Sequence, residues 1–275
     1  MAVTSVTPGG GHGGKAVYAN SAPVDIKEYT ALYPAGAVRV SGSTSHEPDV
    51  PGYGGSVTGL VVMGSSLYNS GYLLTEDGEV VRPSVTTSRV GGGWGDTTFF
   101  ETTRYWREQT PEGLTTQYQL RSDGTLTRWT MDLKRSNPAP IWADRQSVGG
   151  FAAVKTMAMI SQTLTYDTFL ANTRGGALYT IRLPRTSPMK PIVKKVRAST
   201  WQGFEAMVIS KCGQYGTMLV AIDKDTQSAH AYAIGHANGT ATVIQGLGKV
   251  PATFADPVYF HRQIRAADAH MLFGE

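Results

Sequence analysis

The chain of 275 residues is poor in charge and rich in glycine, with 17% charged residues and 32 glycines. An ordinary globular domain has about 25% charged residues and about 7% glycine. This composition excludes a coiled coil and a charge-rich disordered protein, and it favours many short strands joined by tight turns. No apolar run reaches the ~18 residues of a membrane-spanning helix, so we expect no membrane span.

The net charge of +4 comes from 25 basic and 21 acidic residues, a small excess for a nucleic-acid-binding protein. The densest basic stretch runs from Lys190 to Arg197 and has no interleaved aromatic residues. We interpret it as a solvated face and expect no nucleic-acid partner. Cys212 is the single cysteine, so the chain forms no internal disulfide.

The first residues, Met1–Gly14, are rich in glycine and lack the basic and apolar segments of a secretory signal. We interpret residues 1–14 as a flexible arm. The compartment stays open, because the protein is either cytosolic or secreted with a signal peptide that is absent from this sequence.

Turn signals of the β-hairpin type recur along the chain, each between two runs of strand-forming residues. The glycines at positions 78, 124 and 176 are separated by 46 and 52 residues, and Thr226 follows 50 residues later. The turns are Asp77-Gly78, Asp123-Gly124, Gly175-Gly176 and the weaker Asp225-Thr226.

An aromatic marker next to glycine recurs with nearly the same period. Trp94, Phe151 and Trp201 are separated by 57 and 50 residues, and the degenerate marker Pro251–Phe254 begins 50 residues after Trp201. A period of 40–50 residues with four strands is typical of a propeller blade. For the third copy the predicted strands are 153–160, 168–173, 177–183 and 192–197, and for the fourth they are 205–211, 217–222, 229–235 and 240–245.

The sequence therefore predicts an all-β fold, a five-bladed β-propeller of four-stranded antiparallel blades, with residues 1–275 as a single domain. Gly13–Ala19 matches Gly175–Thr180, so we expect the N-terminal strand to close the propeller by pairing in the blade that holds Met271–Phe273. The stretch Ser41–Ser56 is interpreted as a long loop, and Glu108–Gly113 as an extended hairpin tip.

The pattern of Gly149-Gly150-Phe151 followed by Gly175–Thr180, with Trp201–Phe204 after it, resembles that of the tachylectin-2-like five-bladed propellers. The resemblance covers nearly the whole chain, although the repeats of this sequence have diverged from one another. It implies a lectin-like propeller that binds glycans, N-acetyl sugars among them, at sites related to the blades. No cofactor is implied.

Trp94 and Trp201 are the candidate ligand-binding aromatics, with Asp96 and Gln202 beside them to hydrogen-bond sugar hydroxyls. An indole face at a blade junction would match the apolar face of a pyranose ring. The same indoles would serve equally as core between adjacent blades, and both interpretations stay open.

Two other function classes stay open beside the glycan-binding protein, and we favour binding over catalysis. An enzyme would use the central cavity for glycoside cleavage or secondary-metabolite chemistry, and Glu101, Glu205 and Asp256 are its candidate carboxylates, although no paired motif singles them out. The third class is a protein-interaction scaffold. The six histidines form no zinc motif, and His12 is at most a mobile ligand in the arm.

Overall fold

The computed structural model describes residues 1–107, 110–132, 141–265 and 272–275. Regular structure in this part of the chain is β, apart from one short 3-10 turn, Arg82–Ser84. None of its helices has the length and hydropathy to cross a membrane. The chain forms two compact units: the first comprises Met1–Asp96 and Val250–Ala269, and the second comprises Thr97–Lys249 and His270–Glu275.

One sheet of the first unit joins the two ends of the chain, because β20 from the C-terminal segment pairs with β1. Its neighbouring strands are antiparallel throughout. In order across the sheet, the strands are β20 (Val258–Tyr259), β1 (Ala2–Val6), β2 (His12–Ala16) and β3 (Val24–Tyr29).

This sheet corrects two expectations. Residues 1–14 are not a flexible arm, since Ala2–Val6 pairs along its whole length with His12–Ala16. The expected partner of the N-terminal strand is also wrong: Lys15 pairs with Val3 and Asp25, whereas Phe273 forms a bridge to Ser161 in the second unit. Met271 lies outside the described residues. Closure of the propeller by the N-terminal strand stays a prediction.

The other sheet of the first unit has four antiparallel strands and one short parallel strand, β21, at its edge. The stretch Ser41–Ser56 is not a long loop, because β4 and β5 occupy most of it and pair with each other. The strands are β21 (Gln263–Arg265), β4 (Val38–Pro48), β5 (Gly55–Met63), β6 (Ser66–Leu74) and β7 (Thr86–Gly92).

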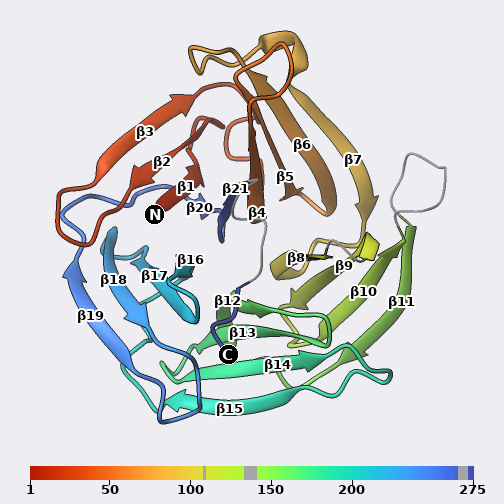
Figure 1. The fold of residues 1–275 in the computed structure, drawn as a ribbon, viewed down its shortest axis with the longest axis vertical. Helices are drawn as coiled ribbons and strands as arrows, with labels where there is room; N and C mark the ends of the chain where they lie inside the picture. The colour runs from red at the N-terminus through yellow and green to blue at the C-terminus, as the bar shows by residue number, and fades with distance from the viewer. Residues whose placement is uncertain (108–109, 133–140, 266–271) are drawn as a thin grey trace. The chain divides into compact units, whose positions relative to one another are not determined.

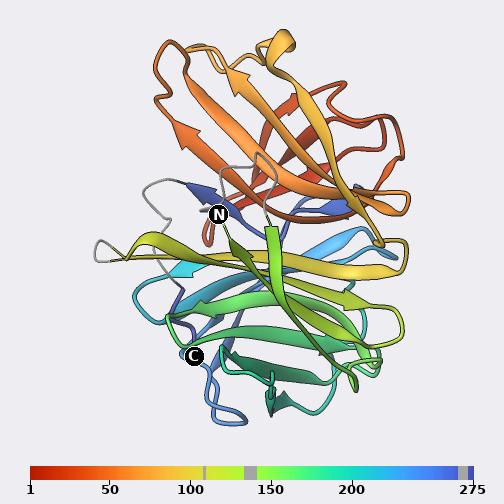
Figure 2. The ribbon, with the colours of Figure 1, turned by 90° about the vertical axis from the view of Figure 1, so that its right-hand side faces the viewer.

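The second unit contains three four-stranded antiparallel sheets (Figures 1 and 2). The hairpin predicted around Glu108–Gly113 is the β8–β9 connection, where Arg107 pairs with Thr110 across residues 108–109, which lie outside the described part. The strands are β8 (Thr97–Arg107), β9 (Thr110–Arg121), β10 (Leu126–Asp132), β11 (Ile141–Val148), β12 (Val154–Gln162), β13 (Tyr166–Thr173), β14 (Leu178–Pro184), β15 (Ile192–Arg197), β16 (Ala206–Cys212), β17 (Gly216–Asp223), β18 (Ser228–Ile234) and β19 (Ile244–Lys249).

Five successive sheets thus make up the described part of the chain, and the predicted fold class, an all-β five-bladed propeller with four-stranded antiparallel blades, is confirmed. The predicted strands of the third and fourth copies agree with β12–β19 within a few residues, and β19 shows the largest shift. Gly124 and Gly176 adopt φ values of 82° and 80° in the β9–β10 and β13–β14 turns, which explains their turn signals.

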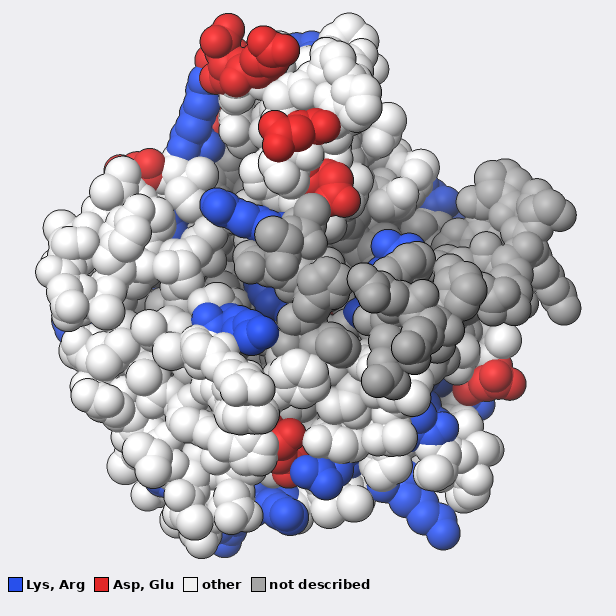
Figure 3. All heavy atoms as spheres, viewed as in Figure 1, with Lys and Arg blue, Asp and Glu red and all other residues white. Residues whose placement is uncertain are grey.

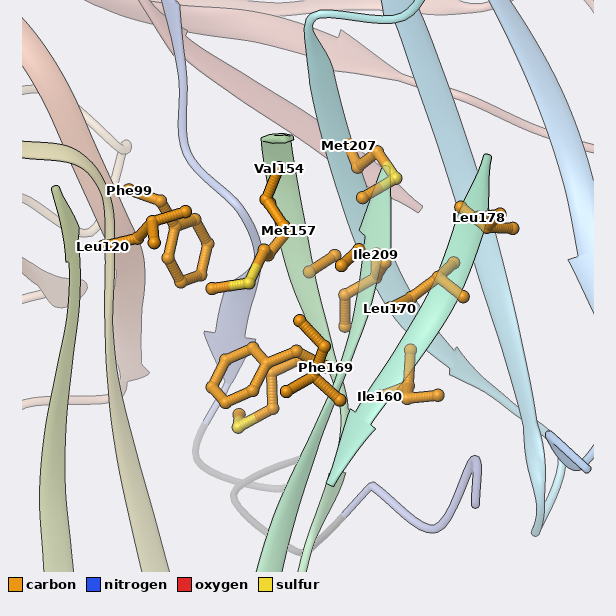
Figure 4. Close-up of a cluster of buried hydrophobic side chains, with 14 of the residues drawn as sticks. Phe99, Leu120, Val154, Met157, Ile160, Phe169, Leu170, Leu178, Met207 and Ile209 are labelled. Atoms are coloured by element: carbon orange, nitrogen blue, oxygen red, sulfur yellow. The ribbon is translucent and has the colours of Figure 1, made fainter. Parts of the chain in front are cut away.

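Each unit has its own hydrophobic core. In the second unit, apolar side chains from β8 and β9 meet those of β12, β13 and β16 (Figure 4). Phe169 of β13 lies edge-on to Phe99 and Tyr118, with ring centroids 5.8 and 5.1 Å apart. In the first unit, Val6, Val61 and Phe260 belong to one buried cluster. These cores pack the sheets of each unit together. Polar residues of the sheets that lie outside the cores remain available to form sites.

Candidate functional site

The aromatic marker of the sequence is a structural joint between successive sheets. For four buried aromatic residues, the main-chain N–H donates to a carbonyl in a hairpin turn of the preceding sheet, at 2.9–3.1 Å. These aromatic residues are 4–9% exposed. The pairs, aromatic residue first, are Tyr33 with Gly10, Trp94 with Ser65, Phe151 with Gly124, and Trp201 with Gly176.

The joint corrects the repeat as read from the sequence. In the β4–β7 sheet the turn that meets the aromatic marker is Gly64-Ser65, between β5 and β6, and not Asp77-Gly78, which follows β6. Tyr33 is a further marker that was not predicted, because no glycine lies within two residues of it, unlike Trp94, Phe151 and Trp201.

The four residues predicted to bind ligand form two pairs, one in each unit. Trp94 and Trp201 are only 4% and 5% exposed, so their indoles present little surface to solvent. Asp96 is partly exposed and Gln202 is exposed. The Trp201 carbonyl accepts a hydrogen bond from Asn172 Nδ2 at 2.8 Å, and the Trp94 carbonyl accepts one from Arg39 Nη2 at 2.9 Å.

The candidate catalytic carboxylates have different surroundings. Glu101 is buried, and its Oε1 accepts a hydrogen bond from the Thr102 N–H at 2.9 Å. Glu205 is half-buried and lies 2.6 Å from Lys155 Nζ. Asp256 accepts a hydrogen bond from Ser5 Oγ at 2.6 Å, and of the three it alone lines one of the two pockets described below.

His12 is a core residue. It is 5% exposed, its Nδ1 lies 2.8 Å from the Tyr72 hydroxyl, and its ring packs against Phe260 with centroids 4.8 Å apart. Burial, with a smaller contribution from the nearby His46, lowers the pKa of His12 to about 4. The expectation of a mobile ligand is therefore wrong. Among the described residues, no group of three or more His, Cys, Asp or Glu side chains is arranged to hold a metal ion.

A pocket of about 380 Å³ lies in the first unit, over the β1–β3 sheet and the segment before β20. Alternation along the strands places the pocket's polar groups on one face. The lining residues are Val3, Ser5 and Thr7 from β1 and the residue after it, Gly13 to Lys15 from β2, and Asp25, Ile26 and Glu28 from β3. The segment before β20 adds Phe254 and Asp256, and β20 itself adds Tyr259.

Three carboxylates line this pocket, and each has a polar partner. Asp256 is held by Ser5 as described above, Glu28 Oε1 accepts from Thr7 Oγ1 at 2.9 Å, and Asp25 Oδ1 lies 2.5 Å from Lys15 Nζ.

Two aromatic rings add apolar surface to the first-unit pocket. Phe254 and Tyr259 lie with ring centroids 6.4 Å apart at an interplanar angle of 48°. Burial is the main cause that raises the pKa of the Tyr259 hydroxyl, and the Asp256 charge adds to it, so this hydroxyl stays protonated. Hydrogen-bonding groups and aromatic edges thus lie around one open cavity.

The sequence pointed to two residues of this pocket, Asp256 as a carboxylate and Phe254 as a degenerate marker, without bringing them together. Ser5 and Thr7 were missed because residues 1–14 were interpreted as an arm, and Lys15 because its predicted strand was assigned to another partner. Polar residues at every second position, as in Ser5 with Thr7, are the available signal of a strand with one face toward a site.

A second pocket, of about 680 Å³, lies in the second unit. It is lined by residues of β9, β10 and β11, by a residue before β13 and by residues after β14. Its lining includes the arginines Arg128, Arg145 and Arg185. On the face drawn in Figure 3, the Lys and Arg side chains of the described residues are interspersed with uncharged and acidic ones.

Neither a family model nor a curated protein matches the chain. Among solved structures, the SapL1 lectin in complex with alpha methyl fucoside matches with 7% identity and a TM-score of 0.41, over 91% of this chain and 96% of that one. The BP39L lectin from Burkholderia pseudomallei matches with 18% identity and a TM-score of 0.38, over 90% of this chain and 66% of that one. At these values the similarity carries no argument about function.

Proposed function

We propose that this protein is a carbohydrate-binding protein and that the first-unit pocket holds a sugar. The observation that carries the proposal is the combination in one cavity of three carboxylates, a lysine and two aromatic rings. Small-molecule sites are concave and of about 300–1,000 Å³, with a few placed polar groups on a partly apolar wall. At about 380 Å³, this pocket is within that range.

The lining groups suit a polyhydroxylated ligand. Carboxylates accept hydrogen bonds from sugar hydroxyls, and charge-assisted bonds of this kind are stronger than neutral ones. Asp256 has one oxygen held by Ser5, which fixes its orientation and leaves its second oxygen as a further acceptor. Phe254 and Tyr259 border the cavity but are only 3% and 6% exposed, so we propose that the polar groups make the main contacts with the sugar.

The resemblance to tachylectin-2-like propellers makes N-acetyl sugars the first ligands to test. Trp94 with Asp96, and Trp201 with Gln202, stay proposed as further sites, in which the accessible Asp96 and Gln202 would contact the sugar. Shallow single sites of this kind should bind with dissociation constants of about 10 μM to 1 mM, or ~4–7 kcal/mol.

A glycan array followed by calorimetry with the best ligand tests the proposal. Asp256→Asn should weaken binding by about tenfold, since the variant keeps the shape and loses the charge. Asp77→Asn, in an exposed turn of the same unit, is the matched control and should leave the affinity unchanged. Equal affinity in both variants, or no glycan bound at all, would exclude this pocket as the sugar site.

A glycoside hydrolase is the second candidate, because the same pocket holds more than one carboxylate. Such enzymes need an acid and a second carboxylate about 5–10 Å apart. A panel of chromogenic glycosides should show no turnover if the protein only binds. Turnover that falls by a hundredfold or more in Glu28→Gln or Asp256→Asn would instead establish catalysis here, and the same assay on Glu101→Gln and Glu205→Gln covers the other candidates.

A further inference from the structure

The floor of the second-unit pocket is a network of buried charges. Asp167 is fully buried, and its Oδ1 lies 3.0 Å from Arg185 Nη2. Its Oδ2 accepts hydrogen bonds from the Tyr118 hydroxyl at 2.7 Å and from Thr103 Oγ1 at 3.0 Å. Asp167 thus has acceptor bonds on both oxygens, and its negative charge is matched by Arg185.

Arg185 is held rigidly by this network. Its Nε donates to the Thr163 carbonyl at 3.1 Å, and its Nη1 donates to Thr116 Oγ1. Burial raises the pKa of the Asp167 carboxyl, and the Arg185 charge is the largest of the influences that oppose this shift. With both partners fixed, Arg185 contributes a pre-positioned guanidinium to the pocket wall.

Arg128 is the unusual member of the floor. It is 4% exposed, and it donates to two neutral carbonyls: Nη1 to that of Pro184 at 2.5 Å and Nη2 to that of Thr186 at 2.8 Å. A buried charge is costly unless an opposite charge pairs with it. Asp167 pairs with Arg185, and these Arg128 donors meet neutral carbonyls, so the floor carries one more positive charge than negative. An anion in the pocket would compensate it.

An uncharged acceptor lies just beneath the pocket wall. The Gln146 Oε1 atom is buried and has no hydrogen-bond partner among the described residues, and Gln146 lines the pocket beside Thr130. A buried acceptor of this kind costs free energy until a donor reaches it. The exposed Arg145 lies over the Trp129 ring, 6.0 Å from its centroid, and Asp144 also lines the pocket. The site is thus built for a ligand that has both an anionic group and a hydroxyl.

We propose that the second-unit pocket binds an acidic sugar, with the carboxylate or sulfate of the ligand against Arg128 and Arg185 and a ligand hydroxyl donating to Gln146. The volume of about 680 Å³ is sufficient for a monosaccharide with a neighbouring residue. The first-unit pocket has different residues, and its charged lining is three carboxylates and one lysine, an excess of negative charge that disfavours the same ligand.

The test is calorimetry with glucuronate, glucose 6-sulfate and glucose at low and at physiological salt, with acetate and inorganic sulfate alone as further probes. We expect the two acidic sugars to bind at least tenfold more tightly than glucose, with an affinity that falls as salt rises. The better of the two identifies the anionic group. Equal binding of glucose, or binding of acetate or sulfate alone as tight as that of the acidic sugars, would overturn the proposal.

Substitutions of the pocket residues test where the ligand binds. Gln146→Leu removes an unpartnered acceptor, so the fold should persist, and the affinity for the acidic sugar should fall by about threefold to tenfold. Arg128→Lys keeps the charge and loses the planar fork, and it should weaken binding by about tenfold. Lys194→Gln, at an exposed position on β15, is the matched control for charge and should change the affinity by less than twofold.

Unchanged affinity in Gln146→Leu, measured on protein whose melting temperature equals that of the wild type, would overturn the assignment even if Arg128→Lys failed to fold. Asp256→Asn separates this site from the first one, since it should leave glucuronate binding unchanged. Asp256→Asn should lose neutral-sugar binding and keep glucuronate binding. Gln146→Leu should lose affinity for glucuronate and keep neutral-sugar binding. The two results together would support both sites.

Discussion

Trp201 is surrounded by aromatic side chains, with the ring centroids of Phe204 and Tyr232 at 5.4 and 4.8 Å. The main-chain N–H of Trp201 donates to the Gly176 carbonyl in the turn, and the Asn172 side-chain amide donates to the Trp201 carbonyl. Such a residue contributes to stability through the apolar area it buries and through the position that it fixes for the next strand. The same reasoning applies to Trp94, whose N–H donates to the Ser65 carbonyl.

Trp201→Ala should reduce the free energy of unfolding by about 3–5 kcal/mol, because the change leaves a large cavity in the core. Urea unfolding followed by circular dichroism measures the loss. Trp201→Phe is the control and should retain most of the stability. A Trp201→Ala protein with wild-type stability and weakened glycan binding would show that the indole is a ligand platform.

His12 makes the stability depend on pH. Its pKa is about 4 in the folded protein and about 6.5 in the unfolded chain, so the unfolded state binds the proton more readily. Neutral His12 makes its full contribution to the free energy of unfolding above pH 6.5, and this contribution is lost as the pH falls toward 4. Between pH 7.5 and 5 the wild type should lose about 2 kcal/mol from this group.

Chemical unfolding of the wild type and of His12→Gln at both pH values isolates this effect, since Gln cannot titrate and other groups contribute equally to both proteins. The free energy of unfolding of the wild type minus that of His12→Gln should be about 2 kcal/mol smaller at pH 5 than at pH 7.5. A difference that stays constant with pH would mean that His12 has the same pKa in the folded and the unfolded protein.

At the scale of elements, the hairpin turn and the following aromatic marker act as one joint. Gly124 adopts φ 82°, and a Cβ atom there would overlap the main-chain nitrogen of Ala152. Two signals that differ in sequence therefore share one period, because each turn must meet the start of the next sheet. The joint is local in space although the residues that form it are 27 apart at Gly124 and Phe151.

Gly124→Ala should destabilise the protein by about 2 kcal/mol or more, since both the left-handed backbone and the close approach exclude a side chain. Gly149→Ala is the matched control, because nothing lies within 4 Å of its Cβ position, and it should change stability by less than ~0.5 kcal/mol. Thermal melts of the two variants test this prediction. Equal melting temperatures would contradict the claim that Gly124 is required for the contact between the turn and the next sheet.

The prediction of elements was most accurate where a turn signal and two alternating strands lie together. The strand pair β13–β14 was predicted from Gly175-Gly176 and its flanks because that hairpin contains the whole of its own signal. The first copy was misread because Asp77-Gly78 is a turn signal as strong as Gly64-Ser65, and only the pairing of β5 with β6 shows which turn belongs to the joint. Local chemistry predicts a turn, and long-range packing assigns its role.

At the scale of the whole molecule, the N-terminal strands are a structural part of a sheet shared with the C-terminal segment. Val3 and Val6 of β1 are buried, and β1 pairs with β20 and β2 on its two sides. Deletion of residues 1–20 removes β1 and β2, which leaves β3 without its neighbour and exposes an edge. The N-terminal segment is therefore required for this sheet.

The truncated protein should aggregate, or melt at a much lower temperature than the wild type. Light scattering and a thermal melt measure the two outcomes. Tyr18→Ser, at an exposed position just beyond β2, lies within the deleted stretch and serves as a control that should melt like the wild type. A truncated protein with an unchanged melting temperature would show that the sheet does not depend on its N-terminal strands.

The sequence by itself determined the repeat, the blade as its unit and most strands of the second unit, because turn glycines and alternating residues act over a few positions of the chain. Only the tertiary structure decided that Ser5 pairs with Tyr259, that Asp256 lies beside Ser5, and that Trp94 and Trp201 are buried. The physical reason is that these arrangements depend on contacts between residues far apart in the chain. No local pattern specifies which distant strand, charge or aromatic ring will be the neighbour.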